Sequence, residues 1–298
     1  MDLMLVLKAV IALSALGLVT SAVLSTAARR FHIEVDPRVE AVASILPGSN
    51  CGACGNPSCF AVAEGIVAGT LPTNACVAGG QSCADGIAVL LGAEACSVAS
   101  VVSVRACGGG TNASRSFTYG GVRSCGAVSR LAGGSIVCSA GCFGFGDCLA
   151  ACPFGAITMD ERGLPAIDLE ACTGCGICVR ECPRGGVGLL ALLDENAPVV
   201  VRCNAHDKVK GRKAACSACC IACKKCERAC PEDAIHVVDM LAVVDYSKCT
   251  GCGTCVSVCP QGCIDVHGRA SEVPSLVADG KGKNAPGFVA EDGVRASE

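Results

Sequence analysis

The chain opens with an unbroken run of apolar and small residues from Ala9 to Ala28, in which serine and threonine are the only polar members. The run has 20 residues, and about 20 apolar residues let an α-helix cross the hydrocarbon core of a bilayer. Arg29 and Arg30 follow directly, and positively charged flanks stay on the cytoplasmic side. The pattern predicts a membrane anchor in residues 1–30, single-pass in the inner (cytoplasmic) membrane, with the bulk of the chain on the cytoplasmic side.

A cleaved signal peptide is the alternative for this run, because Ser25 to Ala28 supplies small residues of the kind found at cleavage sites. Export would carry many thiols into an oxidising space. The anchor is therefore the preferred interpretation.

Shorter apolar segments predict the remaining elements. Residues 60–69 have apolar side chains at helical spacing, and a second helix-like stretch runs around residues 86–92. Short segments at 157–159, 237–238 and 242–244 are strand-like. Only 3% of the residues are aromatic and tryptophan is absent, so a conventional large core is not expected.

Cysteine changes this picture most, with 28 among 298 residues. Such a density in a short secreted chain indicates a disulfide scaffold. Here the chain is long and the cysteines recur in C-x2-C and Cys-Pro steps, which favours metal ligation by thiolates kept reduced in the cytoplasm. The net charge of −3 indicates little about partners, and no broad basic, aromatic-rich surface points to nucleic acid.

The clearest motif is Cys172-x2-Cys175-x2-Cys178-x3-Cys182-Pro183. This is the spacing of bacterial two-cluster ferredoxins, in which the fourth cysteine ligates the other cluster. Gly174 and Gly176 let the backbone wrap around a cubane, because glycine tolerates positive φ. A zinc ribbon would use pairs of C-x2-C and would not need the third cysteine or the Cys-Pro step. The motif therefore predicts 4Fe–4S binding.

A separate group of cysteines lies nearer the N-terminus. Its members are Cys51, Cys54, Cys59 and Cys76. The helix predicted after Cys59 returns the chain, so that Cys76 can complete the group. Four thiolates in this order suit a single 4Fe–4S cluster, and zinc is the alternative.

The cysteine pattern repeats from Cys125 onward. A shift of 78 residues carries Cys125, Cys138, Cys142, Cys148 and Cys152 onto Cys203, Cys216, Cys220, Cys226 and Cys230. A shift of 77 residues carries Cys172, Cys175, Cys178 and Cys182 onto Cys249, Cys252, Cys255 and Cys259. These coincidences indicate two tandem copies of a two-cluster ferredoxin-like module.

The two copies differ at one ligand position, where Phe145 stands in the first copy and Cys223 in the second. In the first copy Cys138 is the predicted replacement, so the two ligand sets are Cys138, Cys142, Cys148 and Cys182, and Cys152, Cys172, Cys175 and Cys178. In the second copy the predicted sets are Cys220, Cys223, Cys226 and Cys259, and Cys230, Cys249, Cys252 and Cys255. The choice of ligands between Cys216 and Cys223 stays open, because Cys216 competes with them.

Five clusters would use 20 of the 28 cysteines. The others are Cys83, Cys96, Cys107, Cys125, Cys203, Cys216, Cys219 and Cys263. Buried free cysteine is common and suits Cys83, Cys96 and Cys263. Cys107, Cys125, Cys203 and Cys216 precede cluster loops, so at least five clusters are expected and a sixth is an open alternative.

The predicted fold class is α+β, with a transmembrane helix, a small single-cluster domain and two tandem ferredoxin-like modules. The predicted bounds are 1–30 for the anchor, 31–105 for the N-terminal 4Fe–4S domain, 106–190 and 191–265 for the two modules with their leaders, and 266–298 for a disordered tail. That tail is rich in glycine, alanine and charge.

No catalytic residue is expected in this chain. It has no G-x-G-x-x-G motif that opens a helix after a strand, no P-loop and no Ser/His/Asp arrangement. Its four histidines are scattered, which favours surface or core roles over ligation. The chemistry expected of the chain alone is electron relay between clusters.

The combination of membrane anchor, Cys51 to Cys76 group, Gly141-Cys142-Phe-Gly-Phe-Gly-Asp-Cys148 and ferredoxin modules resembles the RnfB family over about residues 1–265. RnfB is the multi-cluster subunit of the Rnf membrane complex, and the chain is most similar to forms with two ferredoxin modules. The chain departs from the family pattern at Cys219 and Ala222, where glycines are usual.

The resemblance implies that the chain accepts electrons from reduced ferredoxin and passes them toward NAD+. It also implies that other subunits bind NAD and flavin, and that the complex couples the transfer to translocation of Na+ or H+. On this view the chain is part of an ion-translocating ferredoxin:NAD+ oxidoreductase. Alternatives are a relay to a hydrogenase or dehydrogenase, a relay to a redox-sensing regulator, and a metal-storage or zinc-structural protein.

A basic segment surrounds the third ferredoxin loop. It contains Lys208, Lys210, Arg212, Lys213, Lys224, Lys225 and Arg228, with Arg202 preceding it. A solvated basic loop is the simpler interpretation. The hypothesis weighed against it is a docking patch for an acidic ferredoxin, because complementary charge speeds association and weakens with salt.

Overall fold

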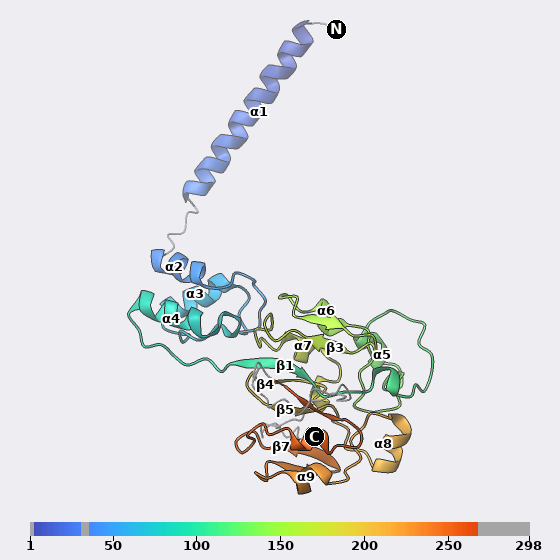
Figure 1. Ribbon diagram of the computed structural model, residues 1–298. Coiled ribbons are helices and arrows are strands. Elements are labelled where there is room, and N and C mark those ends of the chain that lie inside the picture. Colours follow the sequence, from blue (N-terminus) through green and yellow to red (C-terminus); the bar gives the residue numbers. More distant parts are fainter. Residues whose placement is uncertain (1–2, 31–35, 268–298) are drawn as a thin grey trace, which may run out of the picture.

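The computed structural model describes residues 3–30 and 36–267. Helix α1 (Leu3–Arg30) stands apart from the folded body (Figure 1). Its span Val10–Arg30 is long and apolar enough to cross a membrane, and none of it is buried. The sequence-based prediction of an apolar helix here is confirmed. The predicted disordered tail, from residue 268 on, lies outside the described residues.

A small helical unit follows. It consists of α2 (Pro37–Ile45), α3 (Cys59–Val67), the 3-10 turn Val77–Gly79 and α4 (Gly80–Leu91). The Ser58 side chain accepts a hydrogen bond from the Ala61 N–H and so caps α3. Val42 and Ile87 pack between the helices with almost no exposed surface. Helices α3 and α4 confirm the two predicted helical stretches.

Eight strands in the described residues form four antiparallel pairs. The pairs are β1 (Val101–Arg105) with β4 (Leu190–Asp194), β2 (Ile157–Met159) with β3 (Pro165–Ile167), β5 (Val199–Val201) with β8 (Ile264–Val266), and β6 (Ile235–Val238) with β7 (Leu241–Val244). The segments predicted as strands are therefore strands. Two repeating units emerge, each with an outer pair made by its first and last strands and an inner hairpin.

The outer pairs extend beyond the predicted module bounds. Strand β1 precedes residue 106 and pairs with β4, which runs past residue 190. The sequence hides this pairing, because residues 101–105 carry the polar Ser103 and Arg105 buried among valines.

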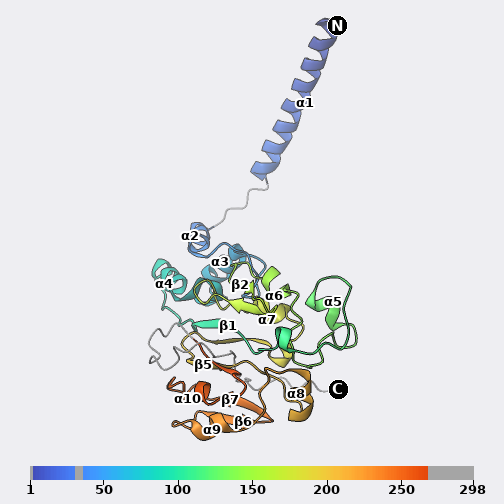
Figure 2. The same ribbon diagram turned by 45° about the vertical axis from the view of Figure 1, so that its right-hand side comes forward.

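Short helices connect the strands. They are α5 (Cys125–Ser129), α6 (Asp147–Ala150), α7 (Ile177–Glu181), α8 (Val209–Ala215), α9 (Lys225–Ala229) and α10 (Thr254–Ser257), with 3-10 turns at Gly110–Asn112 and Gly185–Val187. In both views the helical unit lies nearest α1, the first module comes next, and the second module lies farthest away (Figures 1 and 2).

The two modules are joined by backbone hydrogen bonds as well as by chain connection. The Ser114 N–H donates to Ala215 O at 2.8 Å, and the Ser217 N–H donates to Asn112 O at 3.1 Å. Ala113 and Cys216 form an isolated antiparallel bridge between them. The segments 112–114 and 215–217 therefore make a joint between the leader of the first module and the second module.

Candidate iron–sulfur sites

Four cavities in the described part of the chain are each lined by four of the predicted ligand cysteines. Each contains about 330–340 Å³ of empty space, open solvent included. The four sets are Cys51, Cys54, Cys59 and Cys76; Cys152, Cys172, Cys175 and Cys178; Cys220, Cys223, Cys226 and Cys259; and Cys230, Cys249, Cys252 and Cys255. None of these cysteines forms a disulfide. In the two modules three cysteines come from one loop, and the fourth comes from the Cys-Pro step of the partner motif.

The loops owe their shape to residues with positive φ. In the first module Gly174 and Gly176 have φ of +66° and +73°, and only glycine adopts this region without strain. The loop from Cys220 to Cys226 in the second module, which we call the third loop, takes the same path with Ala222 and Lys224, at φ of +52° and +58°. Its backbone is therefore strained where the other loops are relaxed.

Burial disfavours the charged thiolate form of these cysteines unless a cation takes the place of the proton. Burial, reinforced by neighbouring thiols, raises the pKa of Cys255 to about 12 and that of Cys226 to about 11. Burial likewise raises the pKa of Cys76 to about 11. Binding to iron would release the thiol proton, and the iron would supply the positive charge in its place. A cluster of four irons fits this donor set.

Backbone N–H groups point at several of the sulfurs. Ser103 N donates to Cys172 Sγ at 3.4 Å, Ala234 N to Cys230 Sγ at 3.3 Å, and Cys263 N to Cys259 Sγ at 3.4 Å. Such donors stabilise negative charge on sulfur and tune the reduction potential of a bound cluster.

The remaining predicted set, in the first module, is arranged differently. Cys125 begins α5 and lies near Cys142, Cys148 and Cys182: after burial, it contributes to raising the pKa of all three thiols, and at Cys142 the larger contribution from a neighbouring thiol is that of Cys107. Cys138, which the sequence analysis assigned to this set, has Cys107 and Cys216 as its neighbours. The arrangement thus favours Cys125 in the place of Cys138.

Asp147 fixes the position of Cys125. Its carboxylate accepts hydrogen bonds from the Cys125 N–H, the Gly126 N–H and the Ser124 hydroxyl, each at 2.9 Å. Burial raises the pKa of Asp147, but these bonds outweigh it and lower the pKa below its usual value. Phe145 stands at the position that Cys223 holds in the second module. Its ring packs edge-on against that of Tyr119, with the ring centroids 5.7 Å apart.

A further group of four cysteines lies at the joint between the modules. It consists of Cys107, Cys138, Cys216 and Cys219, and we call it the joint group. A Cβ built on Gly109 would lie 3.3 Å from Cys107 Sγ and 3.7 Å from Cys216 Sγ, so both sulfurs flank this glycine. Burial, then Cys107, Cys219 and Cys138, raise the pKa of Cys216 to about 11. Gly109 N also donates to Cys107 Sγ at 3.4 Å.

Among residues 3–30 and 36–267, no three His, Cys, Asp or Glu side chains are placed as ligands of one metal ion. The cysteines outside the groups above are Cys83, Cys96, Cys203 and Cys263. Cys83 is buried and its thiol lies 3.7 Å from Ile45 O. Cys263 is buried in the wall of the third-loop cavity.

Three protein-family models match separate segments of the chain. "Putative Fe-S cluster" matches residues 46–78, "4Fe-4S dicluster domain" matches residues 138–186, and "4Fe-4S binding domain" matches residues 242–265. These segments contain the N-terminal cavity and loops of both modules.

Curated relatives cover most of the chain. The B component of the ion-translocating oxidoreductase complex of Methanosarcina acetivorans is 40% identical over 87% of this chain and 98% of its own length. The B component of the Na+-translocating ferredoxin:NAD+ oxidoreductase complex of Acetobacterium woodii is 42% identical over 85% of this chain and 75% of its own. The proton-translocating counterpart of Clostridium ljungdahlii is 40% identical over 82% and 86%. The chain belongs to the RnfB family. It is therefore an electron-transfer subunit of an ion-translocating oxidoreductase complex.

The basic segment of this RnfB-family chain is smaller on the surface than the sequence suggested. Arg212 is 1% exposed, and its guanidinium donates to Ala205 O and, at 2.6 Å, to Met240 O. Arg212 is thus a structural residue, and its inclusion in the patch was wrong. Arg202 is also excluded, since its side chain is only 18% exposed and pairs with Asp265 at 2.6 Å. Lys224 pairs with Glu227 at 2.9 Å but remains exposed. The exposed members are Lys208, Lys210, Lys213, Lys224, Lys225 and Arg228, which we call the basic patch.

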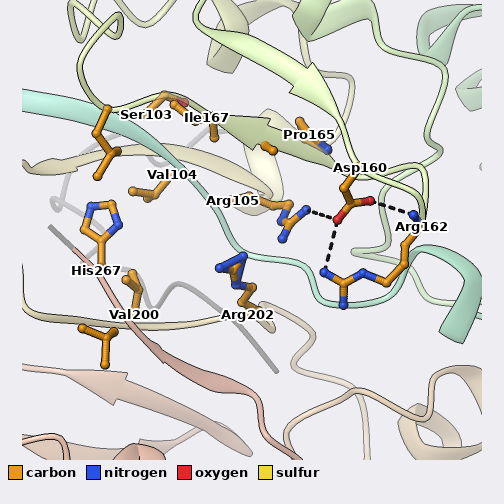
Figure 3. Close-up of a pocket in the computed structure, with 13 residues that line it drawn as sticks. Ser103, Val104, Arg105, Asp160, Arg162, Pro165, Ile167, Val200, Arg202 and His267 are labelled. Atoms are coloured by element: carbon orange, nitrogen blue, oxygen red, sulfur yellow. Dashed lines mark hydrogen bonds and ion pairs between the residues drawn. The ribbon is translucent and has the colours of Figure 1, made fainter. Parts of the chain in front are cut away.

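A larger cavity, of about 730 Å³ including open solvent, lies between the two modules and is lined by β1 and β3 of the first and by β5 and β8 of the second (Figure 3). Arg105 and Arg162 both contact the Asp160 carboxylate, at 3.4 and 3.1 Å. Burial and the nearby Arg105 lower the pKa of Arg202, which also lines the cavity, to about 10. Because these charges are largely paired with one another, we interpret the cavity as part of the boundary between the two modules of this RnfB-family chain.

Proposed function

We propose that this chain relays electrons from reduced ferredoxin toward NAD+ through 4Fe–4S clusters, within a complex that couples the transfer to Na+ or H+ translocation. The observation that carries the proposal is the set of four cavities, each lined by the four cysteines that the motif spacing grouped. Relatives named as components of ferredoxin:NAD+ oxidoreductase complexes support the donor and the acceptor.

Five ligand sets are proposed, and the motif spacing and the geometry support them. Four are the sets that line the cavities. The fifth is Cys125, Cys142, Cys148 and Cys182, because the carboxylate of Asp147 holds Cys125 beside the other three. This set replaces Cys138 in the ligand set that the sequence predicted.

The role of the protein in this relay is binding and tuning. A bound 4Fe–4S cluster supplies a one-electron redox centre. The cysteines hold it, the backbone N–H groups at Cys172, Cys230 and Cys259 stabilise negative charge on its ligands, and buried apolar side chains exclude water.

The joint group is proposed as a sixth cluster site, which would connect the two modules. Its spacing Cys216-x2-Cys219 has no match in the first module, where Gly141 stands in the place of Cys219. The loop Cys107-Gly-Gly-Gly110 brings Cys107 beside Cys216, and the joint hydrogen bonds hold both modules in register. Six sites would use 24 of the 28 cysteines and leave Cys83, Cys96, Cys203 and Cys263.

An anaerobic count of iron and acid-labile sulfide tests this proposal. Six sites predict about 24 irons and about 24 sulfides per chain, and five predict about 20 of each. The variant C216A/C219A should lose about four irons, and Cys96→Ala should lose none. Preparations without acid-labile sulfide would rule out electron relay by this chain.

The donor is proposed to dock at the basic patch, because Lys224 and Lys225 line the cavity of the third loop. Complementary charge speeds association at low salt. Charge reversal of Lys225 and Arg228 to Glu should slow reduction by ferredoxin at low salt several-fold and flatten the dependence on salt. Reversal of Arg123 and Arg130, which are exposed in the first module, is the matched control. Equal rates for both variants would exclude docking at this patch.

The anchor is proposed to place the clusters at the cytoplasmic face. Arg29 and Arg30 at the end of α1 support this orientation.

A further inference from the structure

Three Cys-Pro steps in the chain are followed by the same short pattern with one difference. Cys152-Pro-Phe-Gly continues with Ala156 and Cys230-Pro-Glu-Asp with Ala234, each before isoleucine. Cys259-Pro-Gln-Gly continues with Cys263, also before isoleucine. Of the four Cys-Pro steps from Cys152 onward, two thus have alanine at this position, one has Gly186 and one has the thiol of Cys263.

The backbone at this position has the same role in two of the steps. The Ala234 N–H donates to Cys230 Sγ at 3.3 Å, and the Cys263 N–H donates to Cys259 Sγ at 3.4 Å. The Cys263 side chain then adds a contact that alanine lacks. Its Sγ lies 3.6 Å from Cys259 Sγ, with only 3% of the residue exposed.

Cys263 lines the same cavity as Cys220, Cys223, Cys226 and Cys259. Those four already supply the motif triplet and its partner cysteine. The 3.6 Å separation from Cys259 is that of non-bonded sulfurs, because a disulfide bond is about 2.05 Å long. Cys263 is therefore a fifth thiol beside a complete ligand set.

We propose that Cys263 is a positioning residue that donates its S–H hydrogen bond to the ligand sulfur of Cys259, and so raises the reduction potential of the cluster that Cys259 would help to hold. This rests on the proposed function of the third-loop site. Reduction adds one electron from the donor to the site, and Cys263 keeps its proton throughout, so no bond forms or breaks. A hydrogen bond to sulfur favours the reduced state, because that state carries more negative charge.

The third-loop site lies next to the proposed docking surface of the electron donor. Lys224 and Lys225 of the basic patch line the same cavity. The thiol would thus raise the potential of the site closest to the proposed donor. The first module has no equivalent, since Gly186 stands at the matching position after Cys182.

The test is an anaerobic redox titration followed by EPR, with Cys263→Ala as the main variant. Alanine is the residue at the two equivalent positions, so the loop accommodates it. Loss of one hydrogen bond to a charged group should lower the equilibrium constant for reduction of one cluster about tenfold, a shift of about 59 mV to more negative potential. Cys263→Ser retains a donor and should keep most of the potential. Cys96→Ala should shift no cluster.

A reverse variant keeps the proposal testable should Cys263→Ala fold poorly. Ala234→Cys introduces a thiol beside Cys230 and should raise the potential of the neighbouring cluster. Unchanged potentials in Cys263→Ala with full iron content would overturn the proposal. Loss of about four irons in that variant would also overturn it, because Cys263 would then be a ligand. Absence of sulfide from the wild type would instead reject the proposed function itself.

Discussion

The two ferredoxin-type modules form the corresponding cluster loop from different residues. In the first module the loop from Cys142 to Cys148 has glycines at 144 and 146, both at φ of +82°, and Phe145 between them. In the second module the corresponding loop has Ala222 and Lys224 at positive φ, and Cys223 between them. The first loop is relaxed but lacks a cysteine, and the second is complete but strained.

The comparison indicates that the two loops share a backbone path. On the ligand set proposed above, a cysteine from outside the loop completes the site in the first module. Cys125 stands beside the first loop and is held there by Asp147. Its repeat partner, Cys203, lies buried beside Cys220 and has no vacant ligand position to fill.

The largest expected effect comes from removing these two equivalent cysteines. Cys125→Ala should lose about four irons per chain, because its cluster would have three protein ligands. Cys203→Ala should keep the full iron content and lose only packing. The measurement is iron and sulfide per chain in anaerobic preparations. Equal losses in both variants would contradict the assignment of Cys125.

A smaller effect is expected at Asp147, which has no acidic partner in the second module because Lys225 stands at the equivalent position. Asp147→Ala removes an acceptor from three donors. Each hydrogen bond to a charged group contributes about 2 kcal/mol, so loss of all three should lower the free energy of unfolding by at least about that amount. Anaerobic denaturation followed by cluster absorbance measures it.

The control for this change is Lys225→Ala, which lies on the surface and should alter stability by less than about 0.5 kcal/mol. A similar loss in both variants would show that Asp147 does not hold the first loop.

The smallest effect is expected from relieving strain in the second module. Ala222→Gly and Lys224→Gly should each stabilise the chain by about 0.5–1 kcal/mol, the left-handed backbone cost less the added freedom of the unfolded chain. Gly174→Ala should act in the opposite direction, because its Cβ would meet Val101 O in strand β1. Denaturation midpoints of the three variants test the sign, and destabilisation by both glycines would refute the strain.

Local spacing predicted the parts of the molecule that are local. Cys172, Cys175 and Cys178, which lie within one loop, and Cys152, which precedes a proline, line one cavity, as their spacing predicted. The hairpins β2–β3 and β6–β7 are local in the same sense, because the two strands of each are close in the chain and begin a few residues after a Cys-Pro step. Family membership, which the motifs indicated, was confirmed by relatives across most of the chain.

Other features required the third dimension. Nothing in the spacing distinguishes the proposed ligand Cys125 from Cys138, because both precede the Cys142 loop. The hydrogen bond from the Cys125 N–H to the Asp147 carboxylate, which favours Cys125, is visible only in the structure. The burial of Arg212 was equally hidden, since its carbonyl partners belong to Ala205 and Met240. The pairing of β1 with β4 joins segments nearly a module apart in the chain.

The bonds that link residues 112–114 to residues 215–217 have a consequence for cutting this chain into parts. Removing either copy would leave backbone groups of the other copy without their hydrogen-bonding partners. A single copy excised from this chain should therefore be less stable than the same copy within the full chain.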